Sequence, residues 1–332
     1  MTLLTMLPAY AGYGDVDADG YPSSAERELH LWTNAARVAP KEFTDDYESA
    51  GCGLSDFESS EKESQSIIYF DPDLNEAARY HSDDMYENDW FDHDSSDGTT
   101  FYDRLANFYD NSFVGENIAY GYSNPYVTVM QGWMCSAGHR SNIMYSSWTE
   151  LGTGIVAKYY TQDFGAGAIN SDGPVAMGAH TPQTGSTSIE FLADWEANAA
   201  PESLDLILDG ESYPMALEYG EEELGIYLTD AEITQGNCSE YYFSWETAGG
   251  ETGTFPENGS YLIGGACDSE IMYVEDQDLF GDGNLSESDD TEGDGEKRGI
   301  RFIGCSTMNA SSGAGWLSFV LLGWMAGTRR RR

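Results

Sequence analysis

The hydrophobic pattern of this chain changes period near Pro174, and this change constrains the fold more than any other feature. Before it, apolar residues such as Leu29 and Trp32 recur on one face of a helix, and residues 74–85 repeat that spacing. Two strand-like runs, GENIAYGY and GTGIVAKYYTQDF, are interspersed with the helical patterns. Helices and a few strands in mixed order predict an α+β domain.

After Pro174 the pattern alternates with period two, as in SLDLILDG, LGIYLTD and EYYFSWETAGG. Such short runs, separated by Gly, Pro and Asp, are typical of a small all-β sandwich. A chain of 332 residues is also longer than one ordinary hydrophobic core supports. We therefore predict five segments: an export signal remnant with an acidic stretch (1–24), the α+β domain (25–170), a β-rich accessory domain (171–274), an acidic flexible linker (275–304) and a C-terminal sorting or anchor tail (305–332).

Both ends of the chain carry patterns of protein export. The N-terminal run MTLLTMLPAYA is apolar and closes on Ala9 and Ala11, the small-residue pattern that signal peptidases cleave. At the other end, Cys305 precedes a Gly/Ser spacer, an apolar run over 316–326 and four arginines at 329–332. This order resembles the tripartite sorting tails of myxobacteria-type exoproteins; a plain tail anchor is the alternative. We expect an exported protein, at the cell surface or secreted after processing of both ends, that meets a membrane only through its tail.

The charge of the chain excludes one class of partner. Its 58 acidic residues against 15 basic ones give a formal net charge of −43, which disfavours nucleic acid and anionic lipid. The acidic residues are spread along the whole chain, so a halophilic or cation-rich setting also explains the excess. Because 40% of the residues are hydrophobic, the excess does not indicate general disorder.

The five cysteines suit an exported protein. One belongs to the predicted tail, and the other four allow three disulfide connectivities. The chain has no CxxC pair, so disulfides are favoured over a structural zinc site. We predict a bond between Cys238 and Cys267, which flank a Gly-rich turn, and favour Cys52 with Cys135 for the second.

The stretch DVDADGYPSSAE matches the ligand spacing of a calcium-binding loop. Ligand positions 1, 3, 5, 7 and 12 of such a loop fall on Asp15, Asp17, Asp19, Tyr21 and Glu26. A helix is predicted from about Ala25, as an EF-hand requires. Pro22 within the loop and the missing helix before it favour the alternative, an acidic linker.

Four motifs follow one another in the α+β domain. They are LNEAARYHSDDM (74–85), FDHDSSDGTTFYDR (91–104), GENIAYG (115–121) and GWMCSAGHRSNIM (132–144). In this order they resemble the bacterial SCP-like branch of the CAP superfamily, which includes cysteine-rich secretory proteins, insect antigen 5 and plant pathogenesis-related proteins. The resemblance covers residues 25–167 and implies an α-β-α sandwich. It also implies a three-stranded antiparallel sheet and a cleft lined by histidines and acidic groups.

By motif, the resemblance places His93, His139 and Glu116 in this cleft, with His81 as part of the bacterial pattern. Ser136 stands where eukaryotic members carry a second glutamate, which puts their complete two-His, two-Glu site in doubt here.

Three polar residues near these motifs have structural interpretations. Asp84, three residues after His81 on the same predicted helix, could fix the tautomer of that histidine or bond it as part of the core. Arg140 and Asn142 are expected to tie loop carbonyls and carboxylates together.

Two functions from different classes follow. The first is a secreted binding module whose cleft holds a metal, lipid, peptide or polysaccharide; His93, His139 and Glu116 would suit zinc or a similar ion. The second is a metal-assisted hydrolase of envelope or extracellular polymers, with Glu116 as general base and His81 as a further catalytic residue. A Cys135–His139 nucleophile pair is disfavoured, because a cysteine at a helix end in an exported protein is more often in a disulfide.

Overall fold

The computed structural model describes residues 12–17, 19–169, 171, 173–181, 188–234, 237–264, 267 and 306–308. The predicted export signal, the acidic linker and the arginine block lie outside the described residues. Within the described ranges, no helix is long and apolar enough to cross a bilayer.

The first unit combines helices and one sheet, as the mixed sequence pattern predicts. Its helices are α1 (Ser24–Val38), α2 (Thr44–Ser49), η1 (Leu54–Asp56), η2 (Ser60–Lys62), α3 (Pro72–Glu87), α4 (Phe101–Leu105), α5 (Pro125–Val127), η3 (Thr128–Trp133) and α6 (Ala137–Ile143). Its strands are β1 (Tyr69–Phe70), β2 (Val114–Tyr120), β3 (Glu150–Val156), β4 (Tyr159–Gly165) and β14 (Ser306–Met308). The strand order is β1-β3-β4-β2-β14; β3, β4 and β2 are antiparallel, and β1 runs parallel to β3.

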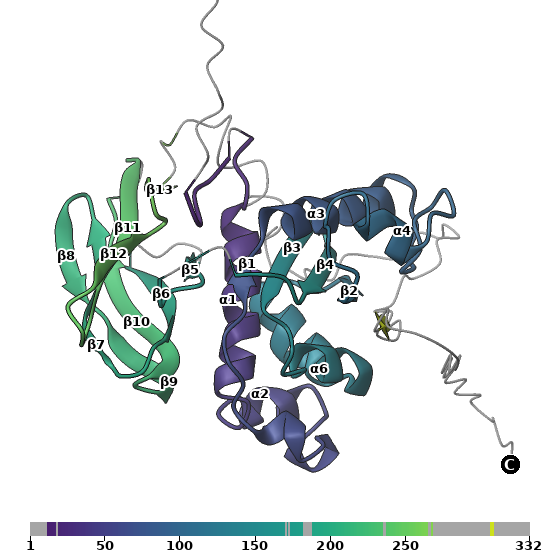
Figure 1. Cartoon of the computed structure of the whole chain (residues 1–332), viewed down its shortest axis with the longest axis horizontal. Coiled ribbons are helices and arrows are strands. Elements are labelled where there is room, and N and C mark those ends of the chain that lie inside the picture. Colours follow the sequence, from purple (N-terminus) through teal and green to yellow (C-terminus); the bar gives the residue numbers. More distant parts are fainter. Residues whose placement is uncertain are drawn as a thin grey trace, which may run out of the picture.

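Helices cover both faces of this sheet, with α3 and α4 on one side and α1 and α6 on the other (Figure 1). Two glycines of β3 allow α3 to lie directly against the sheet. A Cβ at Gly152 would lie 2.0 Å from the backbone of Leu74, and one at Gly154 would lie 2.2 Å from that of Ala78. On the opposite face, the Thr153 hydroxyl donates to a backbone carbonyl of α1. This is the α-β-α layering that the family resemblance implies.

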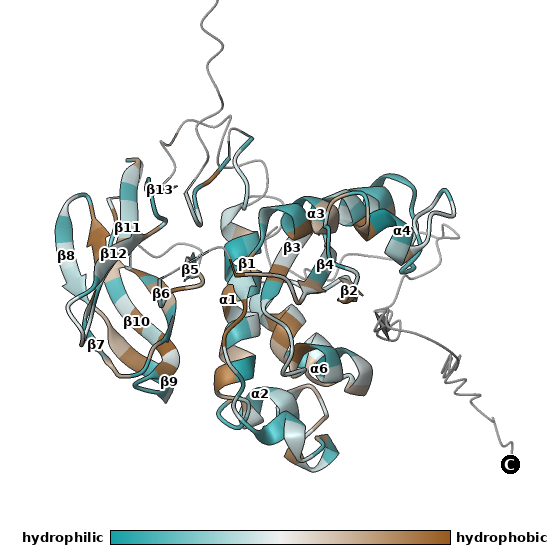
Figure 2. Ribbon diagram, viewed as in Figure 1, coloured by the Kyte–Doolittle hydropathy of each residue, from teal (hydrophilic) through white to brown (hydrophobic). Residues whose placement is uncertain are grey.

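The second unit consists of nine antiparallel strands within the described residues. They are β5 (Gly178–Thr181), β6 (Ser188–Glu196), β7 (Pro201–Leu208), β8 (Glu211–Pro214), β9 (Ala216–Glu221), β10 (Leu224–Glu232), β11 (Ser239–Thr247), β12 (Thr252–Phe255) and β13 (Tyr261–Ile263). One sheet has the order β5-β6-β10-β9 and the other β12-β11-β7-β8, with β13 beside β11. The two sheets meet through Phe191 of β6 and Tyr241 of β11, whose ring centroids are 5.0 Å apart. Apolar and polar bands alternate along these strands (Figure 2), as the period-two pattern predicts.

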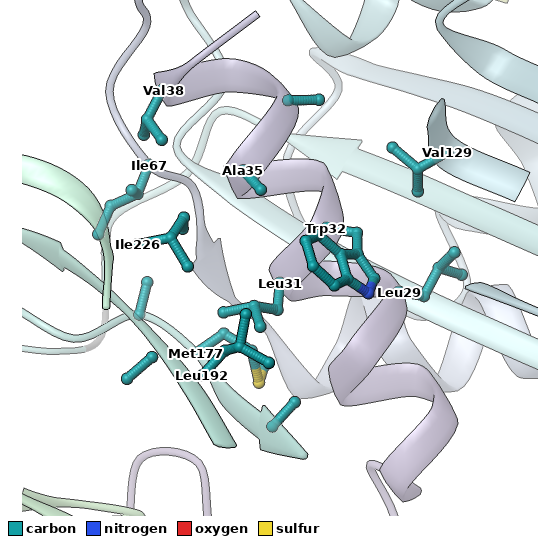
Figure 3. Close-up of a cluster of buried hydrophobic side chains, with 14 of the residues drawn as sticks. Leu29, Leu31, Trp32, Ala35, Val38, Ile67, Val129, Met177, Leu192 and Ile226 are labelled. Carbon is teal, nitrogen blue, oxygen red and sulfur yellow. The ribbon is translucent and has the colours of Figure 1, made fainter. Parts of the chain in front are cut away.

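Helix α1 packs between the two units and contacts both of them. Its N-terminus is closed by a capping box between Ser23 and Glu26. One face packs on the first unit, and another carries Leu31 into a cluster with Met177 and Leu192 of the second unit (Figure 3). Nearly every residue of α1 is therefore buried. The second unit packs directly on the first and is not a separate spacer.

Both predicted disulfides are present. Cys52 is bonded to Cys135, which joins the segment after α2 to the segment after η3. Cys238, just before β11, is bonded to Cys267, which follows β13, and β13 pairs with the start of β11. The Gly-rich turn between β11 and β12 has Gly250 at φ +85°, a conformation that glycine adopts without strain.

Candidate functional site

A buried carboxylate, Glu116 of β2, lies at the centre of the polar groups of the first unit. Its Oε1 accepts a hydrogen bond from Nδ1 of His93 over 2.7 Å, and its Oε2 accepts one from Nη2 of Arg104. Nε2 of His81 lies 3.9 Å from the same Oε1. On the neighbouring strand, Asp163 of β4 stands directly opposite Glu116. We refer to these five residues as the Glu116 cluster.

Helix α3 and the loop between α3 and α4 bring the histidines to Glu116. His81 lies on the inner face of α3, where the apolar spacing places it. The loop is anchored at both ends by carboxylates: Asp84 accepts from the backbone and hydroxyl of Ser96, and Asp94 accepts from the backbone of Phe101. Arg104 of α4 also donates to the carbonyl of His93 over 2.8 Å, so one guanidinium holds both the loop and the carboxylate.

The surroundings of Glu116 keep it ionised. Burial alone would raise its pKa, but the positive charge of Arg104, together with His81 and His93, lowers the pKa to about 2. An ionised carboxylate only accepts hydrogen bonds, so the proton in the contact with His93 lies on Nδ1 of the imidazole.

Burial and the charge of Glu116 have the opposite effect on Asp163. They raise the pKa of Asp163 well above its ordinary value, which favours its neutral acid. The pair is thus one ionised and one protonated carboxyl, facing each other across two strands. Asp163 and Arg104 were not among the site residues predicted from the sequence. The register of TQDF against GENI is the signal that identifies the aspartate.

The expected contact between His81 and Asp84 is absent, and this expectation was wrong. Nε2 of His81 bonds the backbone carbonyl of Asp92 over 3.0 Å, while the Asp84 carboxylate is taken by Ser96. Burial, the main cause, lowers the pKa of His81 to about 4, so its ring is neutral at physiological pH.

The segment around His139 supports β2 from α6. Asn142 donates to the backbone carbonyl of Glu116, and Asn117 donates to the carbonyl of His139. Arg140 bonds the Glu61 carboxylate and the carbonyls of Met134 and Asp56. The structural roles predicted for the arginine and the asparagine are confirmed. His139 itself is buried, and its backbone carbonyl accepts the hydrogen bond from Asn117.

The side chains do not favour the predicted zinc set of His93, Glu116 and His139. The described part of the chain contains no group of three or more His, Cys, Asp and Glu side chains arranged to hold a metal ion. The Arg104 guanidinium on Glu116 also places a positive charge where a cation would lie. Zinc binding stays a prediction from the sequence.

Three of the five predicted calcium ligands, Asp15, Asp17 and Glu26, accept hydrogen bonds from different parts of the backbone. Asp15 accepts from the backbone of Gly12 and Asn258, and Asp17 accepts from the backbone of Asp19 and Tyr21. The carboxylate of Glu26 is buried in the α1 capping box, where it accepts from Ser23. Calcium binding at this loop also stays a prediction, and this arrangement does not favour it.

Comparison with known proteins places this site in a family context. Residues 33–166 match the CAP family, described as the cysteine-rich secretory protein family. Over 98 residues, 29% of this chain, the sequence is 42% identical to the uncharacterized membrane protein YlbC of Bacillus subtilis and covers 28% of it. Over 146 residues, 43% of this chain, it is 33% identical to the uncharacterized protein YkwD of the same organism and covers 54% of it.

Among solved structures, the chain is similar to an extracellular SCP-domain protein from Bacillus anthracis. The identity is 39% and the TM-score 0.28, over 30% of this chain and 34% of that one. The chain thus spans about half or less of the length of these relatives. All five residues of the Glu116 cluster lie inside the matched range. Residues 33–166 of this chain are therefore similar to the CAP family.

Proposed function

We propose that the chain is an exported protein whose CAP domain binds an extracellular ligand through His93. Two disulfides support export, because disulfides persist in oxidising compartments and are rare in the cytosol. The predicted export signal agrees with this location. Surface attachment and the processing of both ends remain proposals that rest on the sequence.

One observation carries the choice of His93: it is the member of the cluster that reaches the surface. Its side chain is 12% exposed, whereas those of His81 and Glu116 are 0% and that of Arg104 is 1% exposed. A ligand at the surface meets an imidazole whose orientation is fixed from behind by a buried carboxylate.

The tautomer of His93 suggests the chemistry of the ligand. In the tautomer that carries its proton on Nδ1, beside Glu116, Nε2 of His93 is a hydrogen-bond acceptor. Such a ring suits a hydroxyl or amide N–H donor, as polysaccharides and peptides carry, better than a lipid chain. In this proposal Glu116 positions the imidazole and does not touch the ligand.

The metal-assisted hydrolase has less support. A general base must reach a water or substrate proton, but Glu116 is fully buried and its two oxygens are bonded to His93 and Arg104. His81 is buried as well.

The test is NMR of the His93 imidazole in histidine-labelled protein, titrated separately with chitotetraose, a muropeptide, phosphatidylglycerol vesicles and zinc chloride. We expect the sugar or the peptide to shift the His93 signals, and His93→Phe to weaken that binding about tenfold through the lost hydrogen bond. Glu87→Gln, an exposed change at the end of α3, should bind like the parent. Shifts with zinc alone, no shift with any probe, or equal binding by His93→Phe would contradict the proposal.

A further inference from the structure

A second site candidate lies on the outer side of α3, away from the Glu116 cluster. There the N-terminal segment folds back over the helix and leaves a cavity of about 500 Å³. The helix contributes Glu76, Arg79, Tyr80 and Asp83 at spacings that share one face. The end of β3 closes the cavity with an apolar wall that includes Ile155.

Four carboxylates line this cavity against one guanidinium. Asp17 and Asp19 come from the N-terminal segment, and Glu76 and Asp83 come from the helix. Oδ1 of Asp17 already accepts hydrogen bonds from two backbone N–H groups. The carboxylates of Asp19, Glu76 and Asp83 make no hydrogen bond or ion pair to any residue that the structure describes. All four carboxylates are exposed, and the lining has a net negative charge because they outnumber the guanidinium of Arg79.

The cavity already holds one organic cation, and it belongs to the protein. The guanidinium carbon of Arg79 lies 3.6 Å from the centre of the Tyr21 ring. At this distance a cation is attracted by the aromatic face. Nε of Arg79 is buried and has no hydrogen-bond partner among the described residues. The pairing shows which chemistry this lining accommodates: a flat or compact cation against a tyrosine, with carboxylates around it.

The spread of the carboxylates distinguishes an organic cation from a metal ion. In the part of the chain that is described, no three acidic or histidine side chains converge on one point, as a metal ion would need. A cation on an aliphatic stem needs fewer converging carboxylates than a metal ion. Its stem would lie on Ile155 and on Tyr80, which is 52% exposed, and its charged end would reach one or two carboxylates. The net charge of −43 raises the local concentration of such ligands.

We propose that this cavity binds an aliphatic amine or guanidine, with Glu76 and Asp83 as the recognising carboxylates. The inference goes beyond the proposed function, because no member of the Glu116 cluster lines the cavity.

The test is calorimetric titration of the full chain with agmatine and with spermidine at about 0.15 M salt, where long-range attraction is screened. The variant Glu76→Gln/Asp83→Asn should weaken both amines at least about fivefold, from two lost ion contacts. The control Glu202→Gln/Glu218→Gln removes the same charge from exposed positions on β7 and β9 and should bind like the parent.

Three results would overturn the inference. Equal weakening in both double variants would mean that the amines follow only the overall charge. Absence of binding heat in the parent would remove the site. Calcium heat that disappears in Glu76→Gln/Asp83→Asn, without any heat from the amines, would make the cavity a metal site instead.

Discussion

Glu116 and Arg104 form a fully buried ion pair at the centre of the first unit. A buried charge is stable only while its partner compensates it, so each residue depends on the other. His93 and the loop that carries it depend on both, because Arg104 bonds the carbonyl of His93 and Glu116 bonds its ring.

Replacing Arg104 by Met should therefore destabilise the protein strongly. The change leaves the Glu116 carboxylate buried without its cation, which typically costs about 3–5 kcal/mol. Urea unfolding measures the loss. The matched control is Lys41→Met, which removes an exposed ion pair to Glu63 at 3.6 Å and should cost less than about 1 kcal/mol. Similar losses in the two variants would argue against a compensated buried pair.

Asp163 should make the stability depend on pH. The pKa of Asp163 is raised in the folded protein. Its contribution to the free energy of unfolding is therefore complete below the pKa of the unfolded chain, about 3.9, and is lost as the pH rises toward the folded pKa. Asp163→Asn removes this titration but keeps the shape of the side chain. The unfolding free energy of the variant should fall less between pH 4.5 and pH 8 than that of the parent, by up to about 1.4 kcal/mol per pH unit. Parallel curves would mean that Asp163 does not hold a proton.

Cluster residues that stand in a sequence motif could be predicted, whereas those that only the fold brings together could not. His93 and Glu116 stand in recognisable motifs and do meet. Asp163 joins them only through the register of two strands, which no local pattern reports. Helical spacing correctly placed Asp84 near His81, but Ser96 of the following loop competes for the same carboxylate.

The two disulfides tie elements that are distant in sequence, and their loops differ in length. Cys52 and Cys135 are separated by 83 positions, and Cys238 and Cys267 by 29. On the chain-entropy relation, the loss of the first should cost about 4.5 kcal/mol and the loss of the second about 3.6 kcal/mol. Urea unfolding of the two double-alanine variants tests this order. A larger loss for the shorter loop would show that local packing outweighs chain entropy.

Strand positions were predictable at the element scale because period two and Gly-rich turns are local signals. The run GTGIVAKYYTQDF covers most of β3 and β4, which are joined by a turn at Ala157 with φ +52°. The environment of α1 was not predictable. Its sequence has one apolar face, yet polar residues on the other faces are buried too, because the second unit covers them. The guanidinium carbon of Arg27, for example, lies 3.8 Å from the centre of the Tyr261 ring of β13.

At the scale of the whole molecule, the two units share α1 and should unfold together. Asp194 of β6 accepts hydrogen bonds from Asn34 of α1 and from the backbone of Ala176 and Met177. This carboxylate thus bonds the second unit to the helix of the first, where an ordinary domain boundary would have few contacts.

Asp194→Ala leaves three buried donors without an acceptor and should cost at least about 2 kcal/mol. Cooperative unfolding of the two units predicts that hydrogen-exchange protection falls equally in α3 of the first unit and β11 of the second. Asp205→Ala, on the exposed side of β7, is the control. Loss of protection in β11 alone would mean that the units unfold independently.

Ionised Glu116, whose charge is balanced by Arg104, holds His93 with a proton on Nδ1. Nitrogen-detected NMR of the imidazole at pH 7 measures this directly, since protonated and unprotonated ring nitrogens have distinct shifts. The Glu116–Arg104 pair predicts that Nδ1 of His93 carries a proton, and that Arg104→Met loses this preference. A His93 ring protonated only on Nε2 in the parent protein would contradict this.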